Sequence, residues 1–205
     1  MKHHPEGLRS LFFTELWERF SYYGMRALLV VFMVEETARG GLGFSTEQAA
    51  LIYGNYTMAV YMLAIPGGLL VDRLVGPTRA VFFGGCIIAL GHFTLAYPSI
   101  PTFYFGLTFI ALGTGLFKPS ISVLVGKLYH SKNDLRDAGF SIFYMGINIG
   151  AFFAPLITGF LAQSSYFKDF LEKNGLSPHL SWHFGFAAAG LGMLFGLGLF
   201  KKNLF

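Results

Sequence analysis

The sequence predicts an all-α membrane protein with six transmembrane helices, and two observations carry this prediction. Of the 205 residues, 54% are hydrophobic and only 13% are charged, a balance well away from that of an average soluble domain. The apolar residues also form six segments, and a helix needs about 20 such residues to cross a hydrocarbon core of about 30 Å. The expected spans are residues 11–36, 47–71, 79–97, 102–125, 138–162 and 183–200.

Lysine and arginine are unevenly shared between the loops at the two ends of the expected bundle. Because cytoplasmic loops carry the excess of these residues, the richer end is expected in the cytoplasm. Both termini lie at that end, so we predict an integral protein of the cell membrane with a cytoplasmic N-terminus. The richer end holds Lys2, Arg9, Arg73, Arg79, Lys127, Lys132, Arg136, Lys201 and Lys202, and the other end holds Arg39, Lys168 and Lys173.

The net charge of +4 follows from this distribution. A nucleic-acid partner would need basic and aromatic residues gathered on one exposed surface, which a set of short loops does not provide. We therefore expect the lipid bilayer, and no nucleic acid, as a partner.

The first segment carries four charges inside the apolar stretch FFTELWERFSYYGMRALLVVFM, residues 12–33. A charge in hydrocarbon costs about 2.5–3.5 kcal/mol on insertion scales, so these side chains should face a partner or a water-filled path. At 100° per residue they share one helix face with two tyrosines. The face comprises Glu15, Glu18, Arg19, Tyr22 and Arg26, with Tyr23 at its edge.

Spacing along this face separates the paired charges from an unpaired one. Glu15 and Arg19 are four residues apart and can form an ion pair. Arg26 has no acid three or four residues away, so it is expected to present a free guanidinium that can grip a carboxylate in a bidentate fork. Two alternatives are a static ion-pair lock and a helix that begins earlier, which would place some charges among the lipid headgroups.

A second cation, Lys118, precedes Pro119 in the middle of the fourth segment. No acid lies in the same segment, so a partner is expected from another helix, and Glu15 and Glu18 are the candidates. A lysine that alternates between carboxylates can couple its protonation to occupancy of a site. The simpler alternative is that the side chain snorkels to the membrane surface.

Three stretches resemble motifs of the proton-coupled oligopeptide transporters within the major facilitator superfamily. ELWERFSYYG, residues 15–24, resembles the ExxERFxYYG signature of that family. GGLLVDRLVGPTR, residues 67–79, resembles the superfamily loop between the second and third helices, and FSIFYMGINIG, residues 140–150, is similar to the fifth-helix motif FYxxINxG. The resemblance implies that residues 1–205 form the N-terminal six-helix bundle of a major facilitator fold, built as a 3+3 inverted repeat.

The resemblance also implies a function, namely a proton-coupled symporter that imports di- and tripeptides by alternating access. The proton gradient would drive it, with no cofactor and no metal. By matching position, the residues of proton coupling are Glu15, Glu18, Arg19 and Lys118. Those of substrate binding are Tyr22, Tyr23, Arg26, Tyr61, Lys118 and Asn148.

The loop motif makes Asp72, Arg73 and Arg79 candidates for a charge latch that breaks and reforms as the two halves rock. A turn at Gly76 and Pro77, with the arginines serving only as cytoplasmic anchors, explains the same residues equally well.

The family is expected to have two six-helix halves, and the C-terminal half is absent from this chain. The resemblance places the acid that holds the amino end of the peptide in that second half. We therefore expect the chain to act with a second half, either covalently attached or supplied by a partner.

Two other functions stay open. A related proton-coupled carrier could take another anionic solute such as nitrate, because Arg26 and Lys118 bind negative charge whatever carries it. A non-transporting membrane assembly partner would use the charges only to fix helix register. No enzyme activity is expected, and no stretch has the Gly-Lys-Ser/Thr spacing of a nucleotide-binding loop.

Overall fold

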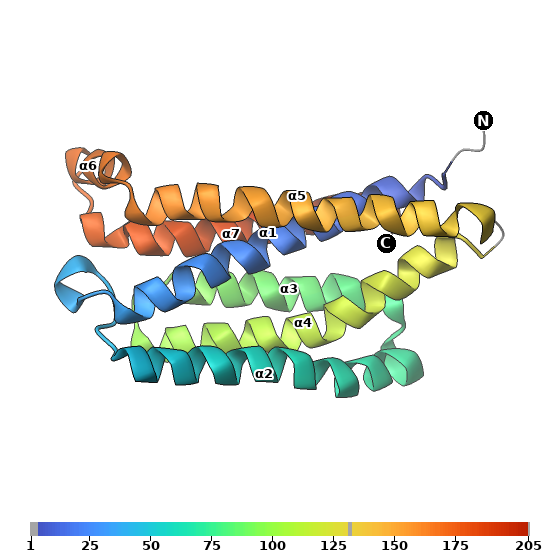
Figure 1. The fold of residues 1–205 in the computed structure, drawn as a ribbon, viewed down its shortest axis with the longest axis horizontal. Coiled ribbons are helices and arrows are strands. Elements are labelled where there is room, and N and C mark those ends of the chain that lie inside the picture. The colour runs from blue at the N-terminus through green and yellow to red at the C-terminus, as the bar shows by residue number, and fades with distance from the viewer. Residues whose placement is uncertain (1–3, 131–132, 205) are drawn as a thin grey trace.

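Long helices aligned along one axis make up most of the computed structural model, which describes residues 4–130 and 133–204 (Figure 1). Two of the basic residues used above for orientation, Lys2 and Lys132, lie outside the described residues. The α-helices of the described part are α1 (Gly7–Val34), α2 (Thr46–Leu70), α3 (Pro77–Leu95), α4 (Ile100–Leu128), α5 (Arg136–Gln163), α6 (Ser165–Lys173) and α7 (Ser181–Leu204).

Each of the six expected segments corresponds to one long helix, so the all-α prediction is confirmed. Helix α6 was not predicted from the sequence, because its nine residues are too few and too polar to be recognised as a membrane span. Five of the described helices, all except α1 and α6, are long and apolar enough to cross a membrane. Helix α1 has 28 residues but carries the charged face described above.

Successive long helices run in opposite directions along the bundle (Figure 1). One end, which we call the terminal end, holds both chain termini, the α2–α3 connection and the facing ends of α4 and α5. The opposite end, which we call the α6 end, holds the α1–α2 and α3–α4 connections together with α6. Among the basic residues that the structure describes, the terminal end has Arg9, Arg73, Arg79, Lys127, Arg136, Lys201 and Lys202, and the α6 end has Arg39, Lys168 and Lys173.

A π-helical turn, η2 (Val71–Val75), extends α2 and is followed by a sharp reversal into α3. Gly76 has a φ of 77°, a left-handed conformation that glycine adopts without steric cost. Pro77 then occupies the first position of α3, where its missing N–H leaves no helical hydrogen bond unmade. The reversal holds Asp72 and Arg73 at the terminal end.

Glycines allow α3 and α4 to pack backbone against backbone. A Cβ atom on Gly91 would lie 2.8 Å from the carbonyl oxygen of Gly106, and one on Gly84 would lie 2.8 Å from that of Gly113. The two pairs are seven residues apart on each helix, so the close contact continues over about two turns. Small residues at such crossings are the usual means by which membrane helices approach each other. Gly146 and Gly150 of α5 face α1 in the same way.

We expect Gly113→Ala to lower the melting temperature of the protein in detergent. The new Cβ would lie 2.6 Å from the Gly84 carbonyl oxygen, so the two helices must separate, and overpacking of this kind costs about 1–3 kcal/mol. Gly198→Ala in α7 is the matched control because its Cβ would meet nothing within 4 Å. Equal melting temperatures for the two variants would contradict the importance of the α3–α4 contact.

Two clusters of buried apolar side chains fill the bundle, one toward each end. On α1, Leu8 and Leu11 belong to the cluster at the terminal end, together with Phe117 and Phe143. The second cluster, toward the α6 end, takes the α1 residues from Met25 to Met33 and packs them on Phe103, Trp182 and Phe186. Glu15, Glu18 and Arg19 lie between the α1 residues of the two clusters, near the middle of the bundle.

Candidate functional site

Three charged side chains of α1 form a buried cluster, which we call the charge triad: Glu15, Glu18 and Arg19. Their exposed fractions are 4%, 0% and 5%. Arg19 Nη2 donates to Glu18 Oε1 at 2.6 Å, and Arg19 Nε donates to the other oxygen of Glu18. Arg19 Nε also lies 3.4 Å from Glu15 Oε1, the i,i+4 pair that the spacing predicts. The closer partner is Glu18, because the two-pronged guanidinium engages both of its oxygens.

The triad holds one positive and two negative charges in a buried place, which leaves one carboxylate imperfectly satisfied. Glu15 Oε2 is buried without a hydrogen-bond partner in the part of the chain that the structure describes. Taking charges out of water is costly unless each is paired and hydrogen-bonded. A proton on one carboxylate would relieve the excess negative charge, so the cluster is chemically suited to bind and release a proton.

Arg26 lies about two turns beyond Glu18 and contacts tyrosines instead of carboxylates. Its Nε donates to Tyr53 Oη at 2.7 Å, Nη2 donates to the same hydroxyl, and Nη1 donates to Tyr22 Oη at 3.2 Å. The guanidinium carbon lies 5.5 Å from the Tyr22 ring centroid and 5.0 Å from that of Tyr53. The expected free cation is therefore held in place by two hydroxyls, but its positive charge is not neutralised.

Tyr22 connects Arg26 to the triad. Its hydroxyl accepts from Arg26, and its ring lies 5.0 Å from the guanidinium carbon of Arg19. Tyr23, at the edge of the charged face, packs edge-on against Tyr22 with 5.4 Å between ring centroids. A movement of either arginine would therefore change its contact with the same side chain, that of Tyr22.

Lys118 of α4 forms a separate group with Tyr61 of α2. Its Nζ lies 4.9 Å from the centroid of the Tyr61 ring, and both side chains are exposed. Among the described residues it forms no ion pair with Glu15 or Glu18, although it interacts electrostatically with Glu15. The structure thus gives Lys118 an aromatic contact where the sequence predicts a carboxylate partner.

The remaining predicted residues lie apart from these contacts. Asn148 is exposed on α5, and its side chain forms no hydrogen bond in the described part of the chain. The latch candidates Asp72, Arg73 and Arg79 are exposed at the terminal end, and within the described residues none of them is ion-paired.

Two tyrosines of α2 were not predicted from the sequence. Tyr53 accepts the hydrogen bonds of Arg26, and Tyr56 is 5% exposed with a hydroxyl that has no partner in the described structure. Three tyrosines within nine residues of an otherwise apolar segment, at positions 53, 56 and 61, are the signal that could have identified them. Hydroxyl-bearing rings are unusual there unless they contact a polar group.

The cations occupy an open face of the bundle. Tyr61 is 58% exposed and Arg26 is only partly buried, so a ligand could approach both cations from the side of α1, α2 and α4. This face offers two positive charges and several tyrosine rings. Such a surface is suited to bind a carboxylate through the cations and a variable organic group through the rings.

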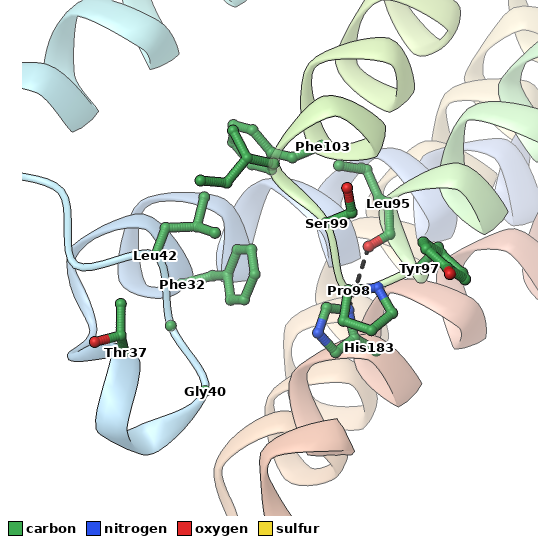
Figure 2. Close-up of a pocket in the computed structure, with 12 residues that line it drawn as sticks. Phe32, Thr37, Gly40, Leu42, Leu95, Tyr97, Pro98, Ser99, Phe103 and His183 are labelled. Carbon is green, nitrogen blue, oxygen red and sulfur yellow. Dashed lines mark hydrogen bonds between the residues drawn. The ribbon is translucent and has the colours of Figure 1, made fainter.

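A cavity of about 320 Å³ at the α6 end contains none of the predicted residues (Figure 2). The α1–α2 and α3–α4 connections and the start of α7 form it, with Phe32, Leu42 and Phe103 supplying apolar walls. His183 lies in it with Nδ1 3.4 Å from the carbonyl oxygen of Leu95. The cavity lacks a charge that could select a carboxylate, and we give it no part in the candidate site.

Comparison with known proteins yields consistent matches. The family described as "POT family" matches residues 78–201. The chain is 50% identical over 206 residues to the uncharacterized transporter YclF of Bacillus subtilis, covering 98% of this chain and 39% of the relative. It is 47% identical to the peptide transporter YePEPT of Yersinia enterocolitica, covering 97% of this chain and 36% of the relative.

The solved structures give the same picture. A crystal structure of a mutant peptide transporter POT in complex with alafosfalin matches with a TM-score of 0.87 and 48% identity. The match covers 97% of this chain and 38% of that chain. The chain therefore spans about two fifths of the length of the relatives that it matches.

Proposed function

The chain belongs to the POT family, and from that premise we propose that it is the N-terminal half of a proton-coupled symporter that imports di- and tripeptides by alternating access. The protein is an integral membrane protein of a transporter family. The observation that carries the proposal is the arrangement on one bundle face of two cations, Arg26 and Lys118, beside a buried carboxylate–guanidinium cluster. Neither cation forms an ion pair with a carboxylate among the residues that the structure describes.

We propose six membrane crossings, with α1 as the sixth spanning helix beside the five apolar ones. The alternating directions of the long helices support this arrangement (Figure 1). Seven basic residues at the terminal end against three at the α6 end, counted among the described residues, support a cytoplasmic location of the terminal end. Glu15, Glu18, Arg19 and Arg26 of α1 are then near the middle of the bilayer, where transporters place their binding sites.

The packing of the helices supports a 3+3 inverted repeat in which α1, α2 and α3 correspond to α4, α5 and α7. Helix α1 packs on α5 as α4 packs on α2, and α3 packs on α4 as α7 packs on α1. Helices α3 and α7 correspond to each other in this repeat, and they also contact each other, as a repeat related by a two-fold axis requires. Helix α5 also packs on α7, whereas α2 and α3 are joined mainly through the η2 turn.

In the proposed substrate complex, Arg26 and Lys118 bind the terminal carboxylate of the peptide. In the described part of the chain, both cations contact tyrosine rings or hydroxyls and neither forms an ion pair, so a carboxylate would gain charge–charge contacts without breaking an ion pair of either residue. Such contacts strengthen in a site of reduced dielectric. The tyrosines, with Tyr23, Tyr61 and Asn148, would line the space for the rest of the peptide.

In the proposed coupling step, the charge triad takes up the proton. A proton on Glu18 or Glu15 would weaken the hold on Arg19, and Tyr22 would transmit the change because it contacts both Arg19 and Arg26. Lys118 joins this step through its charge interaction with Glu15. The acid that holds the amino end of the peptide would come from the second half, and Asp72, Arg73 and Arg79 would form a latch with that half.

Uptake of labelled dialanine into proteoliposomes tests the proposed function. The complete protein that contains this chain should accumulate the dipeptide only when an inward proton gradient is imposed. An ionophore that collapses the gradient is the control and should abolish accumulation. Uptake of nitrate without uptake of dialanine, from folded protein, would show that the cations serve another anion.

Arg26→Lys should weaken peptide binding by roughly tenfold, because a charged hydrogen-bonding contact is worth about 1.5–3 kcal/mol and the bidentate fork is lost. An ammonium also lacks the planar geometry that lets Arg26 bind Tyr53 and Tyr22 together. Competition by unlabelled dialanine for uptake measures the affinity. Arg136→Lys, at an exposed position of the terminal end that has no part in the proposed site or latch, is the matched control. Equal effects of the two substitutions would contradict carboxylate binding by Arg26.

A further inference from the structure

A groove of about 540 Å³ runs between the first turns of α1 and the last turns of α7 at the terminal end. One wall carries Arg9, Phe13 and Trp17 of α1, and the other carries Leu199 and Lys202 of α7, with Glu6 at the rim. The wall residues of α1 follow each other at intervals of four, so they form one stripe along the helix. The groove therefore presents two cations, Arg9 and Lys202, beside aromatic and aliphatic side chains.

This stripe lies on the face of α1 opposite to the charge triad. At 100° per residue, the centre of the stripe of Arg9, Phe13 and Trp17 is about 165° from the centre of the face that carries Glu18 and Arg26. The groove is therefore separate from the proposed peptide site. A ligand in it would contact the outer side of the α1–α7 pair.

The two cations of the groove, Arg9 and Lys202, are unpaired in the part of the chain that the structure describes. Within the described residues, neither Arg9 nor Lys202 forms an ion pair or a side-chain hydrogen bond, and both are exposed. Lys201 differs, because it lies near enough to α3 to act electrostatically on Cys86. The groove thus holds two positive charges that form no ion pair with any described residue.

The side chains that line the inner part of the groove are aromatic and aliphatic, and they are suited to contact lipid acyl chains. The Trp17 ring packs on Phe20 and Phe195, with ring centroids 5.5 and 5.4 Å apart, and Phe195 is 61% exposed. Eight residues separate Arg9 from Trp17, which is about 12 Å along a helix. This distance suits a ligand with an anionic head at the membrane surface and an apolar tail directed into the bilayer.

We propose that this groove binds an anionic phospholipid of the leaflet at the terminal end. The phosphate would lie against Arg9 and Lys202, and one acyl chain would pack along Phe13 and Trp17. Basic pockets between membrane helices recognise anionic headgroups in this way. Glu6 is the one acid in the lining, so it opposes the anion and limits its affinity.

Native mass spectrometry of the complete protein in detergent tests the proposal. The probes are dioleoyl phosphatidylglycerol and dioleoyl phosphatidylcholine, which share their acyl chains and differ in headgroup charge. The double variant Arg9→Gln/Lys202→Gln should bind phosphatidylglycerol at least about fivefold more weakly, with phosphatidylcholine binding unchanged. Glu6→Gln should strengthen phosphatidylglycerol binding.

Two controls separate a site from general surface charge and from misfolding. Lys201→Gln removes the same charge beside Lys202 but does not line the groove, so it should leave lipid binding unchanged. Arg9→Lys/Lys202→Arg keeps both charges and should retain the preference for phosphatidylglycerol. An equal loss in Lys201→Gln, no preference for phosphatidylglycerol over phosphatidylcholine, or displacement of the lipid by inorganic phosphate at equal concentration would overturn the proposal.

Discussion

Lys118→Ala should reduce gradient-driven peptide uptake by roughly 10- to 100-fold while leaving the protein folded, because a hydrogen bond to a charged group is worth about 1.5–3 kcal/mol. The side chain is exposed and its only contact of note among the described residues is the Tyr61 ring, so its removal opens no cavity and breaks no ion pair. The loss would instead remove one of the two cations that face a substrate carboxylate.

The measurement is accumulation of labelled dialanine in proteoliposomes under an inward proton gradient, with the melting temperature in detergent as the test of folding. Lys127→Ala is the matched control, since it removes the same charge from the same helix near the terminal end. Lys118→Arg adds a second test, because arginine keeps the charge but does not release a proton. That variant should still bind peptide and should lose coupling, and normal accumulation by Lys118→Ala would remove this residue from the mechanism.

Sequence periodicity was sufficient for the long helices because each one must satisfy its backbone hydrogen bonds within the bilayer and present apolar side chains to lipid. The same rule explains why α6 was missed. Its residues Ser165–Lys173 mix aromatic and charged side chains over nine residues, and the structure places them at one end of the bundle, outside the long spans (Figure 1). A window set for membrane crossing does not detect such a helix.

The charged face of α1 could also be predicted, because all its members lie on one helix and share its periodicity. Side-chain rotamers and contacts between helices could not. The spacing that pairs Glu15 with Arg19 says nothing about the closer contact, within the same helix, between Arg19 and its neighbour Glu18, which depends on rotamers. The hydroxyl of Tyr53 reaches Arg26 only because α2 lies beside α1 at that level, and no local pattern contains that information.

Lys118 shows the same limit of sequence-based prediction, because the carboxylate partner expected for it is not the contact that the structure gives. The lack of an acid within α4 excludes an ion pair inside the helix, and the sequence then leaves Glu15 and Glu18 as candidate partners, with snorkelling to the membrane surface as the alternative. An exposed lysine needs no carboxylate, because water and the face of the Tyr61 ring stabilise its charge. The sequence could not show that this part of α4 lies on the open face of the bundle.

Glu18→Gln should abolish proton-driven accumulation of peptide while preserving exchange of peptide across the membrane. The amide has the size of the carboxylate and can still accept one hydrogen bond from Arg19, but it neither carries the charge nor binds the proton. Arg19 would then be held mainly by Glu15, whose Oε1 lies 3.4 Å from its Nε. The inside concentration of labelled dipeptide should fall to that outside, even with the gradient imposed.

Glu15→Gln is the variant to compare with Glu18→Gln. It neutralises the other carboxylate of the triad, and that carboxylate has a single contact with Arg19. Glu18 accepts two hydrogen bonds from that guanidinium, whereas one oxygen of Glu15 has no partner in the described structure. We therefore expect Glu15→Gln to cost less accumulation than Glu18→Gln. Counterflow with unlabelled dialanine inside the vesicles measures exchange without a gradient. If Glu18→Gln lost exchange and accumulation equally, the triad would be a structural ion pair that holds α1 in register, and the proton site would have to lie elsewhere.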